Sequence, residues 1–302
     1  MKLVSFSPAG AAEVRVGALA GEHVVDFSAA GVEPWHDMVA FLEAGEQALD
    51  AARQAVANPP EQALVPLGEV RLRAPVPCPR KLFALAGNYY EHIKESRLAA
   101  STAKSSTPRV FMKPPSTTVC GPEDPVVISR YARAVDWEAE LAVVVGKRCK
   151  YVPRGRAEEV IAGYTALNDV SERRLQVWER EETQEWDRFF DWLNGKWLDG
   201  FAPMGPCLVT PEEMPDLSQV RIQLRVNGEK KQDARAGQMI LDVGAIIEYI
   251  SAIVTLEPGD VISTGTPSGV GMASETFLKP GDVMEVEIEG IGVLRNPVVA
   301  EE

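Results

Sequence analysis

The sequence predicts a mixed α/β protein, rich in β-sheet, in which much of the sheet is antiparallel. From residue 73 onward, short β-rich runs alternate with helical stretches, and Asn227-Gly228 follows one β run as a tight hairpin turn would. Pro-Gly-Asp precedes a further β run at 258–260 and again at 280–282. The expected strands of this part are 109–113, 125–129, 138–146, 207–210, 220–226, 260–264 and 283–289.

The first 72 residues are expected to form a small N-terminal α+β domain. Apolar residues at helical spacing predict one amphipathic helix over Trp35–Ala57, ended by Pro59-Pro60. The proline-rich stretch 75–80 is a stiff, poorly helical connector, so we expect domains at 1–72 and 73–302. The strands expected in the first domain are Lys2–Ser5, Val14–Leu19 and His23–Phe27.

Composition excludes several function classes. The formal net charge of −13 argues against a nucleic-acid partner, which would require a basic face. The sequence contains no run of about 18 apolar residues, so it predicts no membrane-spanning helix. The four cysteines show no CxxC spacing, as expected for reduced thiols in a cytoplasmic protein. The glycines of 265–271 do not follow the order of a phosphate-binding loop, so nucleotide binding is not expected.

Three acidic residues predict a metal site. Glu138 and Glu140 are two apart in an apolar β run, so both carboxylates should point from the same face. Neighbouring carboxylates repel each other and are costly to desolvate, which favours a hard divalent cation between them, with Asp169 as a third oxygen ligand. Two alternatives stay open: the strand face is solvated, or Asp169 caps the first turn of a helix.

His92 and Glu95 form a second candidate group. If their segment is helical, these residues are i and i+3 on one face, and the glutamate could orient the imidazole as a base. The alternative is an ordinary ion pair on a surface helix. Small polar residues over 96–107 predict a mobile loop, so the pair could belong to a lid.

Several further side chains suit an acidic substrate. Lys196, within an aromatic-rich stretch, could bind a carboxylate or polarise a carbonyl, or merely make a cation–π contact. Arg173 and Gln176 could bind the same substrate, and Thr266 could add a hydroxyl donor or simply lie in a turn.

Taken in order, these segments resemble the fumarylacetoacetate hydrolase family, over residues 87 to 292. The matching segments are Gly87-Asn-Tyr-x-x-His92-x-x-Glu95, Phe111-x-Lys113-x-x-Ser116, Val135-Asp-Trp-Glu138-Ala-Glu140, Gly163-Tyr-x-x-x-Asn168-Asp-Val-Ser-x-Arg173-x-x-Gln176, Lys196-x-x-Asp199, Pro203-x-Gly205-Pro206, Leu256-x-Pro-Gly-Asp-Val-Ile-x-Thr-Gly-Thr266 and Gly281-Asp, followed by Gly290-x-Gly292.

The resemblance implies a β-rich catalytic domain of mixed sheets with flanking helices, preceded by a small N-terminal domain. It implies Mg²⁺ or Mn²⁺ on Glu138, Glu140 and Asp169 with water completing the shell, a His92–Glu95 dyad that moves protons, and Lys196 beside the metal. It also implies a homodimer and a small oxo-acid substrate. Residues 177–195 are longer than the usual connection, and their aromatic side chains are expected to shape a pocket particular to this chain.

The leading functional hypothesis is a metal-dependent hydrolase that cleaves a C–C bond in a 2,4-dioxo acid, such as an acylpyruvate or fumarylpyruvate. An isomerase or decarboxylase acting on a 2-hydroxy-dienedioate, or on oxaloacetate, is the alternative, because the same site would serve it. A non-catalytic oxo-acid binder is a third hypothesis. The presence of His92, Glu95 and Lys196 argues against that third hypothesis.

Overall fold

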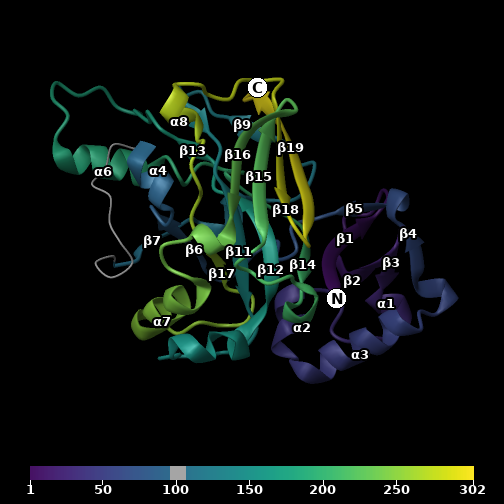
Figure 1. Cartoon of the computed structure of the whole chain (residues 1–302). Coiled ribbons are helices and arrows are strands. Elements are labelled where there is room, and N and C mark those ends of the chain that lie inside the picture. The colour runs from purple at the N-terminus through teal and green to yellow at the C-terminus, as the bar shows by residue number, and fades with distance from the viewer. Residues whose placement is uncertain (96–106) are drawn as a thin grey trace.

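The computed structural model describes residues 1–95 and 107–302, and within them the chain forms two packed sheets with helices around them (Figure 1). The larger sheet has twelve strands among the described residues, with β5 (Val70–Leu72) attached to β1 and β8 (Val119–Cys120) to β14. Its main path runs β4 (Leu64–Pro66), β3 (His23–Asp26), β2 (Arg15–Ala20), β1 (Lys2–Pro8), β14 (Ala202–Val209), β12 (Ile161–Asn168), β11 (Ala139–Val145), β17 (Val261–Ser263), β6 (Leu82–Ala86) and β7 (Arg109–Met112). This architecture confirms the predicted mixed, sheet-rich fold class.

The second sheet contains the predicted hairpin. Asn227 and Gly228 join β15 to β16 with φ angles of 53° and 78°, the left-handed conformation that a tight hairpin turn requires. This sheet runs in the order β16 (Glu229–Arg235), β15 (Arg221–Val226), β18 (Val283–Ile288), β19 (Gly292–Ala300) and β9 (Val126–Ile128), and a separate short pair joins β10 (Val135–Asp136) to β13 (Ser171–Glu172).

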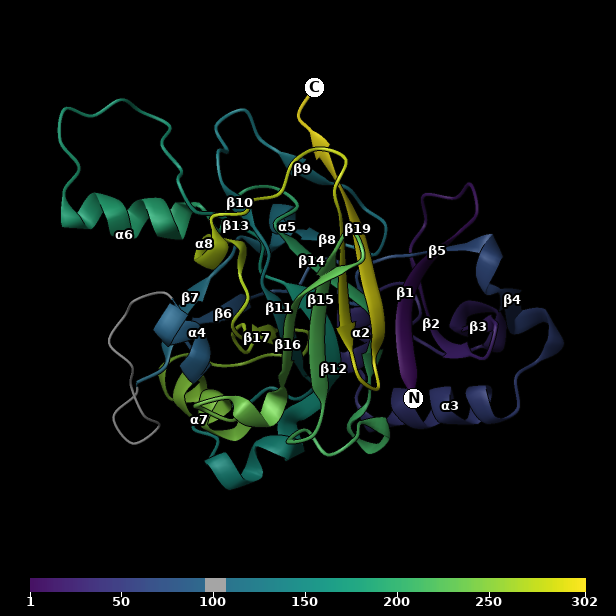
Figure 2. The ribbon, with the colours of Figure 1, turned by 45° about the horizontal axis from the view of Figure 1, so that its top comes forward.

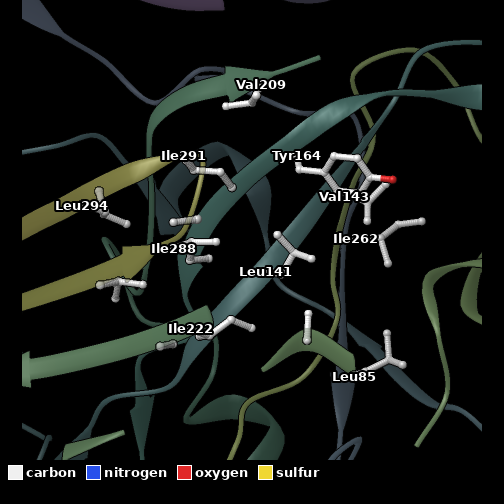
Figure 3. Packing of buried hydrophobic residues seen from close by; sticks show 14 of the residues in the cluster. Leu85, Leu141, Val143, Tyr164, Val209, Ile222, Ile262, Ile288, Ile291 and Leu294 are labelled. Atoms are coloured by element: carbon white, nitrogen blue, oxygen red, sulfur yellow. The ribbon is translucent and has the colours of Figure 1, made fainter. Parts of the chain in front are cut away.

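Strand β11 separates the two halves of the core because its side chains alternate between faces. Leu141 and Val143 pack between the sheets, and Figure 3 shows Leu141 close to Ile222 of β15. Ala142 and Val144 point to the opposite face, where they join the core beneath the N-terminal helices. All seven residues of β11 are buried. The apolar run read from the sequence is therefore a strand covered on both faces.

The helices surround the sheets, and the predicted cap of α7 is confirmed, since Asp242 accepts a hydrogen bond from Ala245 N at 2.8 Å. The single helix predicted over 35–57 is wrong: it is two helices broken at Gly45, whose φ of +67° does not fit a helix. The helices are α1 (Phe27–Ala30), α2 (Met38–Glu43), α3 (Glu46–Ala57), α4 (Tyr90–Glu95), α5 (Pro115–Thr118), α6 (Glu185–Asn194), α7 (Val243–Ile253) and α8 (Gly271–Ser274).

The N-terminal strands continue the larger sheet. β1 pairs antiparallel with β14, with Leu3 opposite Leu208, so strands from both sides of residue 72 share one hydrogen-bonded sheet. The division into domains at 1–72 and 73–302 stays a prediction. No helix in the described ranges is both long and apolar enough to span a bilayer.

Candidate active site

Glu138, Glu140 and Asp169 meet at the ends of two paired strands. Ala139 of β11 lies opposite Asn168 of β12, which brings the residues beside them together. One carboxylate oxygen from each acidic residue lies within 4.8 Å of the others. Asp169 N also donates to Glu138 O at 2.9 Å, so the backbone fixes this approach.

Both alternatives to a metal site are wrong on geometry. The strand face is not solvated, because Glu138 is only 5% exposed and Glu140 and Asp169 are 0% exposed. Asp169 does not begin a helix either, since the chain continues into β13. A buried trio of carboxylates needs compensating charge or a bound cation.

Three cationic side chains, Lys196, Arg173 and Lys113, supply part of that charge. Lys196 Nζ donates to Glu138 Oε2 at 2.7 Å and to Asp169 Oδ2 at 2.6 Å. Arg173 donates to Glu138 Oε1 and, at 2.9 Å, to Asp136 Oδ2. Burial alone would raise the pKa of Glu138, but the charges of Lys196 and Arg173 hold that pKa below its ordinary value.

Lys113 is a site residue to which the sequence reasoning gave no role. Its Nζ donates to Asp169 Oδ1 at 2.5 Å, and its side chain is 0% exposed. It was visible as a lysine that ends the apolar run 110–112 within one of the family-like segments. A charged residue directly after an apolar run was the available signal.

Glu140 is the carboxylate whose charge is left uncompensated. Its Oε2 accepts from Ser263 Oγ at 2.6 Å and from Gly265 N at 2.7 Å, whereas its buried Oε1 has no hydrogen-bond partner among the described residues. Burial, together with the charges of Asp169 and Glu138, raises the pKa of Glu140 well above its ordinary value. An orphaned carboxylate oxygen that meets two more carboxylates fits a hard divalent cation.

The His92–Glu95 pair lies on α4. His92 Nδ1 is 2.8 Å from Glu95 Oε1, and Gly269 N donates to Glu95 Oε2 at 2.9 Å. The side chains are only 13% and 18% exposed, so this is not an ordinary surface ion pair. Apart from residue 107, the loop expected to be mobile, 96–107, lies outside the described residues.

A cavity of about 630 Å³ is lined by Glu138 and by this pair, whereas Glu140 and Asp169 are not among the described residues that line it. The predicted site residues that line it are His92, Glu95, Glu138, Arg173, Lys196 and Thr266. Gln176 is half-buried and is not among the described residues that line the cavity. The Thr266 hydroxyl is occupied by the backbone, since it donates to Ala139 O at 3.1 Å.

The aromatic segment contributes to the cavity through one residue. Trp192 of α6 lines it and packs edge-on against Phe111, with ring centroids 5.1 Å apart. Trp186, Phe189 and Phe190 are exposed instead, and Figure 2 shows α6 projecting away from the sheets. The segment therefore borders the cavity without filling it.

A buried carboxylate trio is held by three cationic side chains, and Glu138 lines one cavity together with a His–Glu pair. On this two-sheet fold the arrangement defines a metal-dependent enzyme. The family model described as "Fumarylacetoacetate (FAA) hydrolase C-terminal" matches residues 81–299. The chain belongs to the fumarylacetoacetate hydrolase family.

Characterised relatives of this family differ in their reactions. The chain is 38% identical over 303 residues to the mitochondrial oxaloacetate tautomerase Fahd2a of Rattus norvegicus, covering 99% of this chain and 92% of the relative. It is 29% identical to maleylpyruvate hydrolase from Sphingobium sp. SYK-6, solved with manganese(II) and pyruvate, with a TM-score of 0.79 and full coverage of both chains. It is 32% identical to 5-carboxymethyl-2-hydroxymuconate delta-isomerase from Mycobacterium smegmatis, with a TM-score of 0.74 and again full coverage of both chains.

Proposed function

We propose that this protein is a divalent-cation-dependent hydrolase that cleaves a C–C bond in a 2,4-dioxo acid of the acylpyruvate or fumarylpyruvate type. The observation that carries the proposal is the buried trio of Glu138, Glu140 and Asp169, of which Glu138 lines the same cavity as the His–Glu pair. The trio suits a cation that chelates a 2-oxo acid, and the pair suits proton transfer.

Glu138, Glu140 and Asp169 would hold Mg²⁺ or Mn²⁺, with water completing the shell. When bound, such a cation withdraws electron density from the carbonyl and carboxylate oxygens of a 2-oxo acid. The manganese and pyruvate in the Sphingobium structure support this assignment.

Lys196 adds positive charge where negative charge develops on the substrate. Lys196 lines the cavity, and its ammonium is held by two of the carboxylates and lies 5.4 Å from the Phe111 ring centroid. Because Lys196 is only 2% exposed, little solvent screens its charge. Arg173 is held rigidly by Asp136 and Glu138, and it offers a second cation toward a substrate carboxylate. Thr266, which lines the cavity, and Gln176, which is not among the described residues that line it, stay weaker proposals for substrate contact.

His92 is the proposed general base. Glu95 holds the Nδ1 side of the ring, which favours the tautomer that leaves Nε2 basic, and Gly269 N fixes Glu95 in turn. In hydrolysis His92 would take a proton from the water that attacks the distal carbonyl. The C–C bond to the distal carbonyl carbon then breaks, and its electron pair becomes the enolate of pyruvate, whose negative charge lies toward Lys196. Protonated His92 would return its proton to the enolate carbon, which gives pyruvate and a carboxylic acid.

Tautomerisation or decarboxylation of oxaloacetate, or isomerisation of a 2-hydroxy-dienedioate, is the second candidate. The observation that favours it is the 38% identity to an oxaloacetate tautomerase across 99% of this chain. These reactions need stabilised negative charge on the oxo acid, and tautomerisation and isomerisation also need a proton carrier, but none needs an attacking water. A non-catalytic oxo-acid binder is disfavoured, because His92, Glu95 and Lys196 line the cavity.

Product analysis decides between these reactions. The purified protein is incubated with an acylpyruvate, oxaloacetate or a hydroxymuconate-type diacid, each with Mg²⁺ or Mn²⁺. Pyruvate plus a carboxylic acid from the first substrate supports the hydrolase, whereas turnover of the other two alone supports the second candidate. His36→Ala, a change at an exposed histidine, is the matched control for His92→Ala. No turnover of any of the three substrates would contradict both proposals.

A homodimer, a cytoplasmic location and a role in aromatic catabolism also stay proposals. Light scattering at micromolar concentration should give twice the chain mass of 32.9 kDa, and a monomer would refute the dimer. Relatives described as mitochondrial do not support the cytoplasmic location expected from the sequence.

A further inference from the structure

The oxygens of the three carboxylates are not equally available to a cation. Five of the six accept at least one hydrogen bond from the described residues, and only Glu140 Oε1 accepts none. A carboxylate whose second oxygen is already committed acts as a one-oxygen ligand. The partners of those second oxygens therefore decide how many ligand atoms the site offers.

On Glu140 the committed oxygen is Oε2. Ser263 Oγ donates to it at 2.6 Å and Gly265 N at 2.7 Å, so two donors use both of its lone-pair directions. Ser263 is fully buried on β17 and lies opposite Ala142 of β11. Ala142 is two residues after Glu140, so both point from the same face of β11. Glu140 could offer both oxygens to a cation only by giving up a buried hydrogen bond.

On Asp169 the committed oxygen is Oδ1. Lys113 Nζ donates to it at 2.5 Å, and its two other hydrogens go to Phe201 O at 2.7 Å and Val170 O at 3.0 Å. All three donors of the ammonium are used, which fixes Lys113 in place. Lys196 Nζ bridges Asp169 Oδ2 and Glu138 Oε2 at 2.6 and 2.7 Å, and Lys196 lines the cavity. A cation that enters the site would replace the Lys196 ammonium on Oδ2, whereas Lys113, whose three donors are all used, stays on Oδ1 and leaves Oδ2 as the ligand atom.

We infer that Ser263 and Lys113 are positioning residues that restrict Glu140 and Asp169 to one ligand oxygen each, so that the site selects Mg²⁺ or Mn²⁺ over Ca²⁺. Ca²⁺ takes six to eight oxygens and often both oxygens of one carboxylate, whereas Mg²⁺ is small, six-coordinate and satisfied by single oxygens and water. This inference rests on the proposed metal site and adds the residues that tune it.

The test compares Mn²⁺ and Ca²⁺ affinities of the full chain by titration calorimetry, with Ca²⁺ also measured by competition. Ser263→Ala frees one lone pair of Glu140 Oε2, and the affinity ratio should move toward Ca²⁺ by about tenfold. Ser251→Ala is the matched control, because Ser251 is an equally buried serine in α7 whose Oγ accepts from Val152 N. Its ratio should equal that of the parent.

Lys113→Met provides an independent variant of similar shape, and it should move the ratio in the same direction as Ser263→Ala. If Lys113→Met does not fold, the serine variant alone still decides. Equal weakening of both cations by Ser263→Ala would show a purely structural role and overturn the inference. If the parent protein binds Ca²⁺ as tightly as Mn²⁺, the inferred selectivity is overturned, but the proposed metal site stands. Parent protein that binds neither cation would instead refute the metal site proposed above.

Discussion

Replacing Glu140 by glutamine should stabilise the cation-free protein and abolish cation binding at the same time. The amide oxygen can keep the hydrogen bonds from Ser263 and Gly265, which places the NH₂ group where the orphaned Oε1 meets the other carboxylates. The change removes a buried charge that has no partner of its own. It also replaces a ligand oxygen with a donor that cannot bind a cation.

The size of the effect follows from the geometry. Like charges up to 4.8 Å apart repel by about 3.5 kcal/mol at an effective dielectric constant near 20. Lys113, Lys196 and Arg173 offset part of this repulsion, so a net gain of about 1–2 kcal/mol is expected. With 302 residues the unfolding entropy is about 0.6 kcal/mol/K, which converts the gain into a Tm rise of about 2–3 °C.

The assay is thermal unfolding, with EDTA and with Mn²⁺ at a hundred times the dissociation constant. Mn²⁺ should stabilise the parent by about 2.7 kcal/mol, or about 4 °C, and should not shift the variant. Glu172→Gln is the matched control, because that buried carboxylate accepts backbone hydrogen bonds from Arg133, Ala134 and Arg174. It should lower Tm in EDTA and keep the Mn²⁺ shift.

Two results would refute this reasoning separately. A Tm in EDTA at or below that of the parent would show that Glu140 is compensated in a way that the hydrogen bonds do not reveal. A full Mn²⁺ shift in Glu140→Gln would show that Glu140 is not a ligand.

Three further predictions follow from the same structure. His92→Ala should leave Mn²⁺ affinity nearly unchanged and reduce C–C hydrolysis by about 10²- to 10⁴-fold. Oxaloacetate decarboxylation should fall less. Hydrolysis at the parent rate would refute the role of the His92–Glu95 dyad as general base. Burial raises the pKa of the Cys120 thiol to about 12, so iodoacetamide at pH 8 should label exposed Cys78 before Cys120. Equal labelling of the two cysteines by mass spectrometry would contradict this. Leu141→Ala should cost about 2–5 kcal/mol in chemical denaturation, because Leu141 is fully buried between the sheets.

Part of the fold could be read from the sequence because the relevant patterns are local. The apolar run around β11, the Asn-Gly turn and the aspartate cap of α7 each depend on a few adjacent residues. Strand β12 was missed, because its sequence Ile-Ala-Gly-Tyr-Thr-Ala-Leu-Asn has neither alternation nor a long apolar run. It is a strand because both of its neighbours, β11 and β14, pair with it.

The sequence by itself determined the chemical types at the site and the spacing of Glu138 and Glu140, since a period of two is a property of any strand. Tertiary structure alone decided that Asp169 joins them, because the register of β11 against β12 is set by pairing across the sheet. It also decided that Lys113, 56 residues away from Asp169, is its partner. Contacts between distant segments depend on the packing of the whole chain, and a single sequence carries no local pattern that specifies them.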